Sequence, residues 1–191
     1  VVSISAVGSL REHIPPLDMV VPDQIIDRTR NRVSTFFGDG IVAHIAFSDP
    51  FCPEISSTLA DAGKNQATTH VGGTCVVIEG PQFSTRAESE LYRSFGADII
   101  GMTALPEAKL AREAELCYAT LALVTDFDTW HQTEDDVSVE MVIANLRRNV
   151  ANSQRVLRQV VAGLPSERGC ACGHALETAI ITDPQHIGSD A

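Results

Sequence analysis

Two aspartates stand one residue apart at the end of an apolar run, Leu121-Ala-Leu-Val-Thr-Asp126-Phe-Asp128. The run is typical of a buried strand, and side chains two residues apart on a strand share a face. Both carboxyl groups are therefore expected to point the same way at the carboxyl end of a strand, where open α/β sheets bind ligands. Two buried acids raise each other's proton affinity, so the pair could donate a proton to a ligand. Acids of a surface loop are the alternative interpretation.

Two further junctions, at residues 5–9 and 101–103, place small or polar groups directly after an apolar run. The hydroxyls of Ser5 and Thr103, with backbone N–H groups, could bind an anion without net positive charge. Ahead of a predicted helix, Phe83 offers a face that could stack on a planar ring. Singly, such serines and threonines are more often turn formers. Together with the acid pair they predict a cleft for a planar heterocycle beside an oxyanion.

Strand-like and helix-like segments alternate along most of the chain, which predicts an α/β fold with a largely buried sheet. Thr85 with Glu88 fits a helix capping box. The apolar positions from Val139 onward follow the 3.6-residue period of a long helix. Strands are expected at residues 1–6, 41–47, 70–78 (with a bend at its two glycines), 96–102 and 117–125, and helices at 53–63, 85–95, 106–115 and from 139.

Composition excludes several classes of protein. A net charge of −11 argues against a nucleic-acid or anionic-membrane surface. No apolar run is long enough to span a membrane, and 191 residues suffice for a single domain. The five cysteines do not form a secreted framework, which indicates reduced thiols and a cytoplasmic location. Because the chain opens on a strand-like run without Met, we expect an N-terminal stretch to be absent.

A metal site is not expected. Cys170, Cys172 and His174 lie close together in the sequence, but they are three candidate ligands without a fourth at a usable spacing.

Several segments, in collinear order from residue 1 to about 157, resemble the S-methyl-5′-thioadenosine phosphorylases of the trimeric purine nucleoside phosphorylase family. The most specific are Glu-Gly-Pro-Gln-Phe-Ser-Thr-Arg-Ala-Glu-Ser at residues 79–89 and Asp-Phe-Asp-Thr-Trp at residues 126–130. The resemblance implies a nucleoside phosphorylase-like fold, a central mixed sheet flanked by helices, of which residues 1–191 are a partial single domain. The family's first strands, glycine-rich phosphate loop and Arg-His pair would lie upstream of Val1.

The resemblance also implies the activity. The family comprises pentosyltransferases of purine and methionine salvage, in which phosphate attacks C1′ of methylthioadenosine and releases adenine and 5-methylthioribose 1-phosphate. Inorganic phosphate is a co-substrate, and no cofactor is expected. The partners would be the nucleoside, phosphate and the other subunits of a homotrimer.

Site residues follow from the same resemblance. Asp126 would protonate purine N7, and Asp128 would bind the 6-amino edge of the base. The remaining roles are phosphate binding by Ser5, Ala6 and Thr103, base and ribose binding by Phe83, Ser84 and Met102, enclosure of the methylthio group by Val139 and Val142, and contact with a neighbouring subunit's substrate by His44.

Other functions remain open at this point. One is a 6-oxopurine nucleoside or methylthioinosine phosphorylase, although such relatives typically carry Glu at the position of Ser84 and Asn at that of Asp126. A second is a nucleosidase that uses water in place of phosphate. A third is a truncated, inactive fragment.

Overall fold

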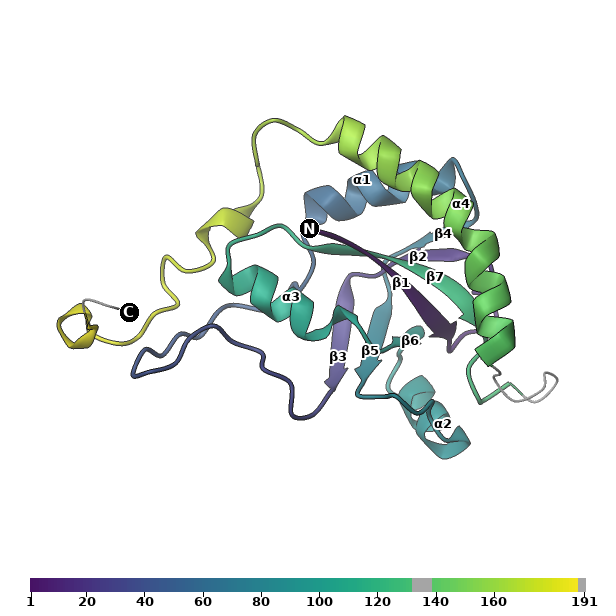
Figure 1. The fold of residues 1–191 in the computed structure, drawn as a ribbon, viewed down its shortest axis with the longest axis horizontal. Helices are drawn as coiled ribbons and strands as arrows, with labels where there is room; N and C mark the ends of the chain where they lie inside the picture. The colour runs from purple at the N-terminus through teal and green to yellow at the C-terminus, as the bar shows by residue number, and fades with distance from the viewer. Residues whose placement is uncertain (132–138, 189–191) are drawn as a thin grey trace.

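A mixed sheet of seven strands organises the residues described by this computed structural model, 1–131 and 139–188 (Figure 1). Strand order is β3-β5-β6-β1-β7-β2-β4. Strands β3, β5 and β6 are parallel to one another, β6 is antiparallel to β1, and β1 is parallel to β7. The strands are β1 (Val2–Ser9), β2 (Met19–Val21), β3 (Gln24–Arg28), β4 (Thr69–Val71), β5 (Thr74–Ile78), β6 (Ile99–Gly101) and β7 (Ala119–Asp126).

Helices cover both faces of the sheet, and the interior strand β7 is buried along its whole length. Leu121 and Leu123 pack on one face with α1 (Pro53–Lys64) and α4 (Val139–Gly163), while Ala122 and Val124 pack on the other with α3 (Ala104–Glu113). Each buried leucine of this kind contributes about 1.5–3 kcal/mol of transfer free energy. The two-residue alternation of a strand thus divides β7 between two apolar layers.

The helix starts predicted at Pro53 and after Thr85 are confirmed, whereas α3 begins at Ala104, two residues before the expected start. Pro53 opens α1 at a position where its missing N–H leaves no broken hydrogen bond. At the start of α2 (Arg86–Ser94), the Thr85 hydroxyl accepts from the Glu88 N–H, and the Glu88 carboxylate accepts from the Thr85 N–H. Two short 3₁₀ helices, η1 (Ala171–His174) and η2 (Pro184–His186), lie in the C-terminal segment.

Two expected strands differ in the structure. Residues 41–47 form a single bridge, Ala43 with Ile180, because the backbone of this segment pairs with the irregular C-terminal segment. The run at 70–78 is divided at Gly72 and Gly73, whose φ angles of 86° and 103° favour glycine. The break is larger than the bend expected: β4 lies at the sheet edge beside β2, whereas β5 lies between β3 and β6.

Residues 29–50 form an arm that extends from the sheet beside the C-terminal tail, residues 164–188 (Figure 1). Backbone hydrogen bonds of 2.8 Å from His44 to Ala179 and of 3.0 Å from Ile181 to Val42 join the arm and the tail. None of the described helices is long and apolar enough to cross a membrane.

Candidate active site

A cavity of about 330 Å³ lies at the carboxyl ends of β5, β6 and β7, over the middle of β1. Its volume is in the range of small-molecule sites. Every predicted site residue except Val139 and His44 lines it. The full lining is Ile4, Ser5, Ala6, Val7, Gly8, Ile78, Phe83, Ser84, Ile100, Gly101, Met102, Thr103, Thr125, Asp126, Asp128 and Val142.

Ser5 and Thr103 meet in this cavity with their hydroxyl oxygens 2.7 Å apart. The expectation that Ser5 follows a strand was wrong, since β1 continues to Ser9. Strand β6 runs antiparallel to β1, with Ile100 opposite Gly8, so the residues after β6 return along the middle of β1. The antiparallel direction of β6 therefore brings the two hydroxyls together. They offer neutral donors to an anion.

Asp126 is the last residue of β7, and its carboxylate is held by two donors. The Thr125 hydroxyl donates to Oδ2 at 2.7 Å, and the Asp128 backbone N–H donates to Oδ1 at 2.9 Å. Asp128 lies beyond the strand with φ 49°, in the left-handed region. Both acids face the cavity, as predicted. The expected cause was the alternation of side chains along a strand, but Asp128 is directed to the cavity by the turn after β7.

Gly8 gives the two acids room above β1. It is paired with Asp126 in the sheet, next to an irregularity in the β1–β7 register. A Cβ atom at Gly8 would lie 2.9 Å from Oδ1 of Asp126 and 3.2 Å from Cβ of Asp128. Any larger residue at this position would therefore push the acid pair out of place.

Burial defines the electrostatics of the site. It raises the pKa of the Asp128 carboxyl, and the neighbouring Asp126 and Glu88 carboxylates act in the same direction. Oδ2 of Asp128 and the Ser84 hydroxyl are buried and have no hydrogen-bond partner among the residues described. A buried polar atom without a partner costs about 1–3 kcal/mol. A ligand that presents polar groups to both atoms would remove that cost.

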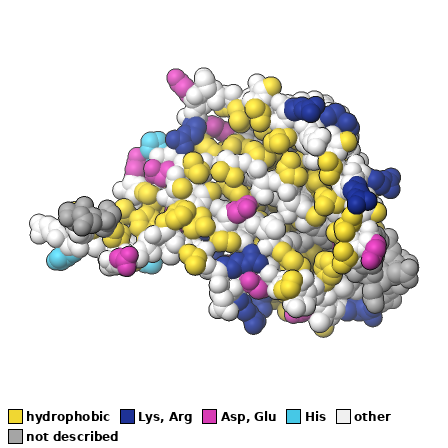
Figure 2. All heavy atoms as spheres, viewed as in Figure 1, with side chains coloured by type: hydrophobic (Ala, Val, Ile, Leu, Met, Phe, Trp, Pro, Cys, Tyr) yellow, Lys and Arg dark blue, Asp and Glu magenta, His cyan; other side chains and the backbone are white. Residues whose placement is uncertain are grey.

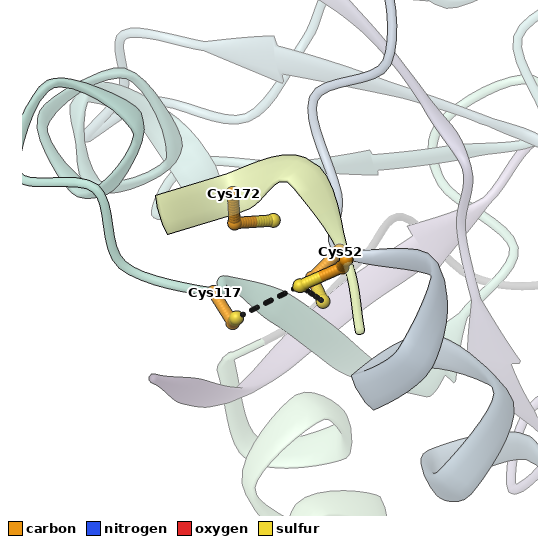
Figure 3. A group of neighbouring side chains, drawn as sticks. Cys52, Cys117 and Cys172 are labelled. Atoms are coloured by element: carbon orange, nitrogen blue, oxygen red, sulfur yellow. Dashed lines mark hydrogen bonds between the residues drawn. The ribbon is translucent and has the colours of Figure 1, made fainter. Parts of the chain in front are cut away.

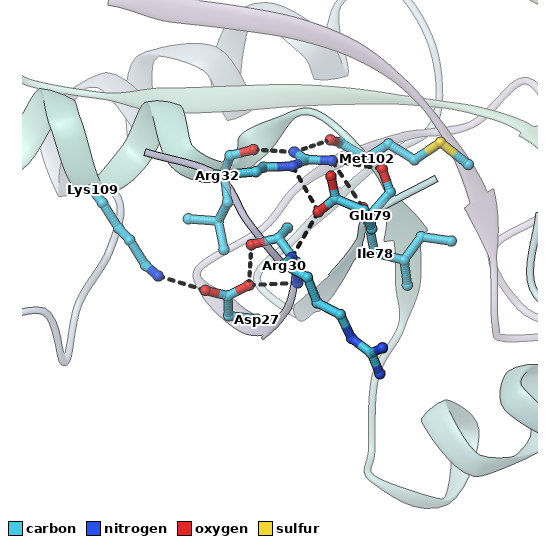
Figure 4. A network of polar contacts seen from close by, with 9 residues as sticks. Asp27, Arg30, Arg32, Ile78, Glu79, Met102 and Lys109 are labelled. Atoms are coloured by element: carbon cyan, nitrogen blue, oxygen red, sulfur yellow. Dashed lines mark hydrogen bonds and ion pairs between the residues drawn. The ribbon is translucent and has the colours of Figure 1, made fainter. Parts of the chain in front are cut away.

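Arg32, on the arm, binds backbone groups beside the site (Figure 4). Its guanidinium donates to the carbonyl oxygens of Met102 at 2.7 Å, Leu105 at 2.5 Å and Glu79 at 2.7 Å. It also pairs with the Glu79 carboxylate at 3.0 Å. This one side chain ties the turn after β5 to the turn after β6. Sequence reasoning missed it, because a polar stretch bounded by glycine is typical of a surface loop.

Two predicted residues lie outside the cavity. Val139 begins α4 with 57% of its surface exposed, while Val142, which was also predicted to enclose the methylthio group, lines the cavity one turn later. His44 is exposed on the arm. A contact of His44 with a neighbouring subunit therefore stays a prediction.

A separate group of side chains lies away from the cavity. The sulfur atoms of Cys52, Cys117, Cys170 and Cys172 lie within 4.8 Å of one another. The expectation of three metal-ligand candidates without a fourth was wrong, because Cys52 and Cys117 are distant in sequence and reach the same point through the fold, while His174 is not part of the group.

Comparison with known proteins identifies relatives along almost the whole chain. Residues 1–162 match the family model described as the phosphorylase superfamily. An S-methyl-5′-thioadenosine phosphorylase of Koribacter versatilis is 56% identical over 184 residues, covering 96% of this chain and 63% of the relative. The chain thus spans less than two thirds of that protein's length.

Solved structures agree with these matches. A crystal structure of a methylthioadenosine phosphorylase from an antarctic soil metagenomic library superposes with a TM-score of 0.92 at 54% identity, covering 99% of this chain and 68% of that one. A methylthioadenosine phosphorylase from Schistosoma mansoni in complex with adenine gives a TM-score of 0.89 at 34% identity, covering 94% and 72%.

Proposed function

This chain belongs to the phosphorylase superfamily and, within it, to the S-methyl-5′-thioadenosine phosphorylases, and from this premise we propose that the protein cleaves S-methyl-5′-thioadenosine with phosphate. The products are adenine and 5-methylthioribose 1-phosphate, which makes the protein a pentosyltransferase of purine and methionine salvage. Residues 1–191 are part of one nucleoside phosphorylase domain. The observation that carries the proposal is the placement of a buried acid pair and a pair of hydroxyls in one cavity.

The reaction moves charge in two directions. An oxygen of phosphate forms a bond to C1′, and the bond from C1′ to N9 breaks with its electron pair on the purine. Positive charge develops on the sugar and negative charge on the departing base. Phosphate, bound by Ser5, Ala6 and Thr103, stabilises the positive charge on the sugar. Asp126 neutralises the negative charge on the base by donating a proton to N7.

Adenine fits the polar atoms of the base pocket. Its exocyclic amine is a hydrogen-bond donor, and Oδ2 of Asp128 is a buried acceptor without a partner among the described residues. Phe83, at the pocket edge, supplies a stacking face, and Met102 lies beside Gly80 where the ribose would pass. The positions of Ser84 and Asp126 also differ from the Glu and Asn typical of 6-oxopurine phosphorylases.

A competition assay tests the choice of base. The complete protein is given methylthioadenosine and methylthioinosine together with phosphate, and the released bases are separated by chromatography. We expect adenine to be released at least tenfold faster than hypoxanthine. Equal rates, or faster release of hypoxanthine, would contradict the assignment.

The working assembly is proposed to be a homotrimer in which His44 reaches the substrate of a neighbouring subunit. The arm and tail support this proposal, because they extend from the sheet and expose apolar side chains (Figure 2). Among these side chains, Val33 is 79%, Phe36 66% and Ile181 62% exposed. Exposed apolar groups of this kind mark protein interfaces. Mixed trimers of Asp126→Ala and His44→Ala subunits should regain activity, and a failure of mixed trimers to do so would refute the shared site.

A cytoplasmic location is part of the proposal. Its support is that the five cysteines are free thiols, as is typical of a reducing compartment.

A further inference from the structure

Four of the five cysteines converge from separate parts of the chain, on the side of the sheet covered by α1 and α4. Cys52 is the residue before α1, Cys117 precedes β7, and Cys170 and Cys172 lie at the start of η1 in the tail. Figure 3 shows the sulfur atoms of Cys52, Cys117 and Cys172 pointing into a common space between these segments.

The spacing of the sulfur atoms matches that of metal ligands. Cys170 lies 3.7 Å from Cys52 and 3.4 Å from Cys117, sulfur to sulfur, and all four sulfurs are within 4.8 Å of one another. Four thiolates bound tetrahedrally to zinc at about 2.3 Å have sulfurs about 3.8 Å apart. The four sulfur atoms are thus about as close together as the ligands of a single zinc ion.

The surroundings favour a closed structural site. Cys52 and Cys172 are 1% and 4% exposed and belong to an apolar cluster that includes Ile55, Leu59 and Val156, while Cys117 and Cys170 are half-buried beside it. Four protein ligands that complete the coordination by themselves are typical of structural zinc sites.

Metal binding would change the charge of this cluster. The ligands of a thiolate site are deprotonated, so zinc would displace the protons of the four thiols, and a soft dication would balance the charge that remains.

We propose that Cys52, Cys117, Cys170 and Cys172 bind one zinc ion, which fastens the C-terminal tail to the body of the protein. Hydrogen bonds from Arg168 and Leu176 to Glu115 also join the tail to the body near this point. Zinc would hold η1 against α1 and β7, and through the tail it would support the arm. The site is separate from the cavity, so the proposal stands or fails independently of the reaction.

Metal analysis of the complete protein, purified under reducing conditions without chelator, tests the proposal. We expect about one zinc ion per chain, and cobalt substitution should give the visible absorption bands of a tetrahedral thiolate site. Cys170→Ala and Cys172→Ala should each lose most of the zinc. Cys75→Ala is the matched control, because Cys75 is a buried cysteine of β5 outside the cluster, and its zinc content should be unchanged.

A second measurement serves if the cluster variants do not fold. Titration of the unmodified protein with an organomercurial should release zinc in step with modification of the four thiols, and trypsin should then cut after Arg168 faster than before. Protein that contains no zinc while all its thiols react freely would overturn the proposal. Iron in place of zinc, or disulfides among the four cysteines in protein kept reduced, would overturn it as well.

Discussion

The backbone N–H of Asp128 donates a hydrogen bond of 2.9 Å to the carboxylate of Asp126, which joins the turn after β7 to the end of the strand. The two acids thereby have different surroundings. Asp126 accepts from two donors, whereas Asp128 keeps a buried oxygen without a partner among the residues described. The resemblance to the family assigns them different tasks, and we propose on that basis that Asp126 acts at N7 and Asp128 at the amine.

Replacing each acid should separate these tasks. Asp126→Ala removes the proton donor, and we expect kcat to fall by about 10²–10⁴-fold in the complete protein. Asp128→Ala should act mainly on KM, because it removes an acceptor for the base. Steady-state kinetics with methylthioadenosine decide the matter. More than a tenth of the parent activity in Asp126→Ala would exclude Asp126 as the acid.

Gly8→Ala should disable the site without unfolding the protein. The new Cβ would lie 2.9 Å from Oδ1 of Asp126, so the acid must move. A displacement of this size in a catalytic group costs about 10²-fold in rate. Gly38→Ala is the matched control, since nothing lies within 4 Å of a Cβ there. Equal activity in the two variants would show that the close approach has no catalytic consequence.

Asp128 should make stability depend on pH. Burial raises its pKa above the ordinary value of 3.8, so the folded state holds this proton more tightly than the unfolded state. The cost of the buried charge is absent below the unfolded pKa, grows as pH rises, and is complete above the folded pKa. Asp128→Asn should therefore raise Tm at neutral pH, with a gain that disappears in acid.

Thermal melts across this pH range provide the check. Asp39→Asn, which changes an exposed acid, serves as the control for the lost charge. A gain that is independent of pH, or the same in the control, would refute the role assigned to burial.

The 5′ specificity should depend on Val142. Its side chain lines the cavity, while Val139 is exposed outside it. A lost apolar contact with a methyl-sized group is worth about 10–200-fold. Val142→Ser should lower kcat/KM for methylthioadenosine by about tenfold and for adenosine by less, whereas Val139→Ser should have a smaller effect. Identical losses of kcat/KM in the two variants would indicate that both valines contact the methylthio group, and would contradict the role given to Val142 alone.

Local patterns along the chain predicted much of the fold. The capping box at Thr85 and the apolar run that ends at Asp126 depend on neighbours in sequence, and both were predicted correctly. The strand expected at 41–47 did not form, because an apolar run becomes a strand only where a partner lies beside it, and here the partner is a single residue, Ile180.

Contacts between residues distant in sequence were not predicted. Arg32 binds Glu79 and Met102, and Cys52 meets Cys172, through a chain path that no local spacing reveals. The acid pair and the two hydroxyls were assigned to one cleft because each follows an apolar run. Their actual geometry depends on the antiparallel direction of β6 and on the left-handed turn at Asp128.

Phosphate dependence of the complete protein tests the central claim most directly. Methylthioadenosine is incubated with and without inorganic phosphate, and both the base and the sugar product are identified by mass spectrometry. We predict adenine together with 5-methylthioribose 1-phosphate, and turnover only when phosphate is present. Adenine released at the same rate without phosphate, with free 5-methylthioribose as the sugar product, would contradict phosphorolysis and identify a nucleosidase.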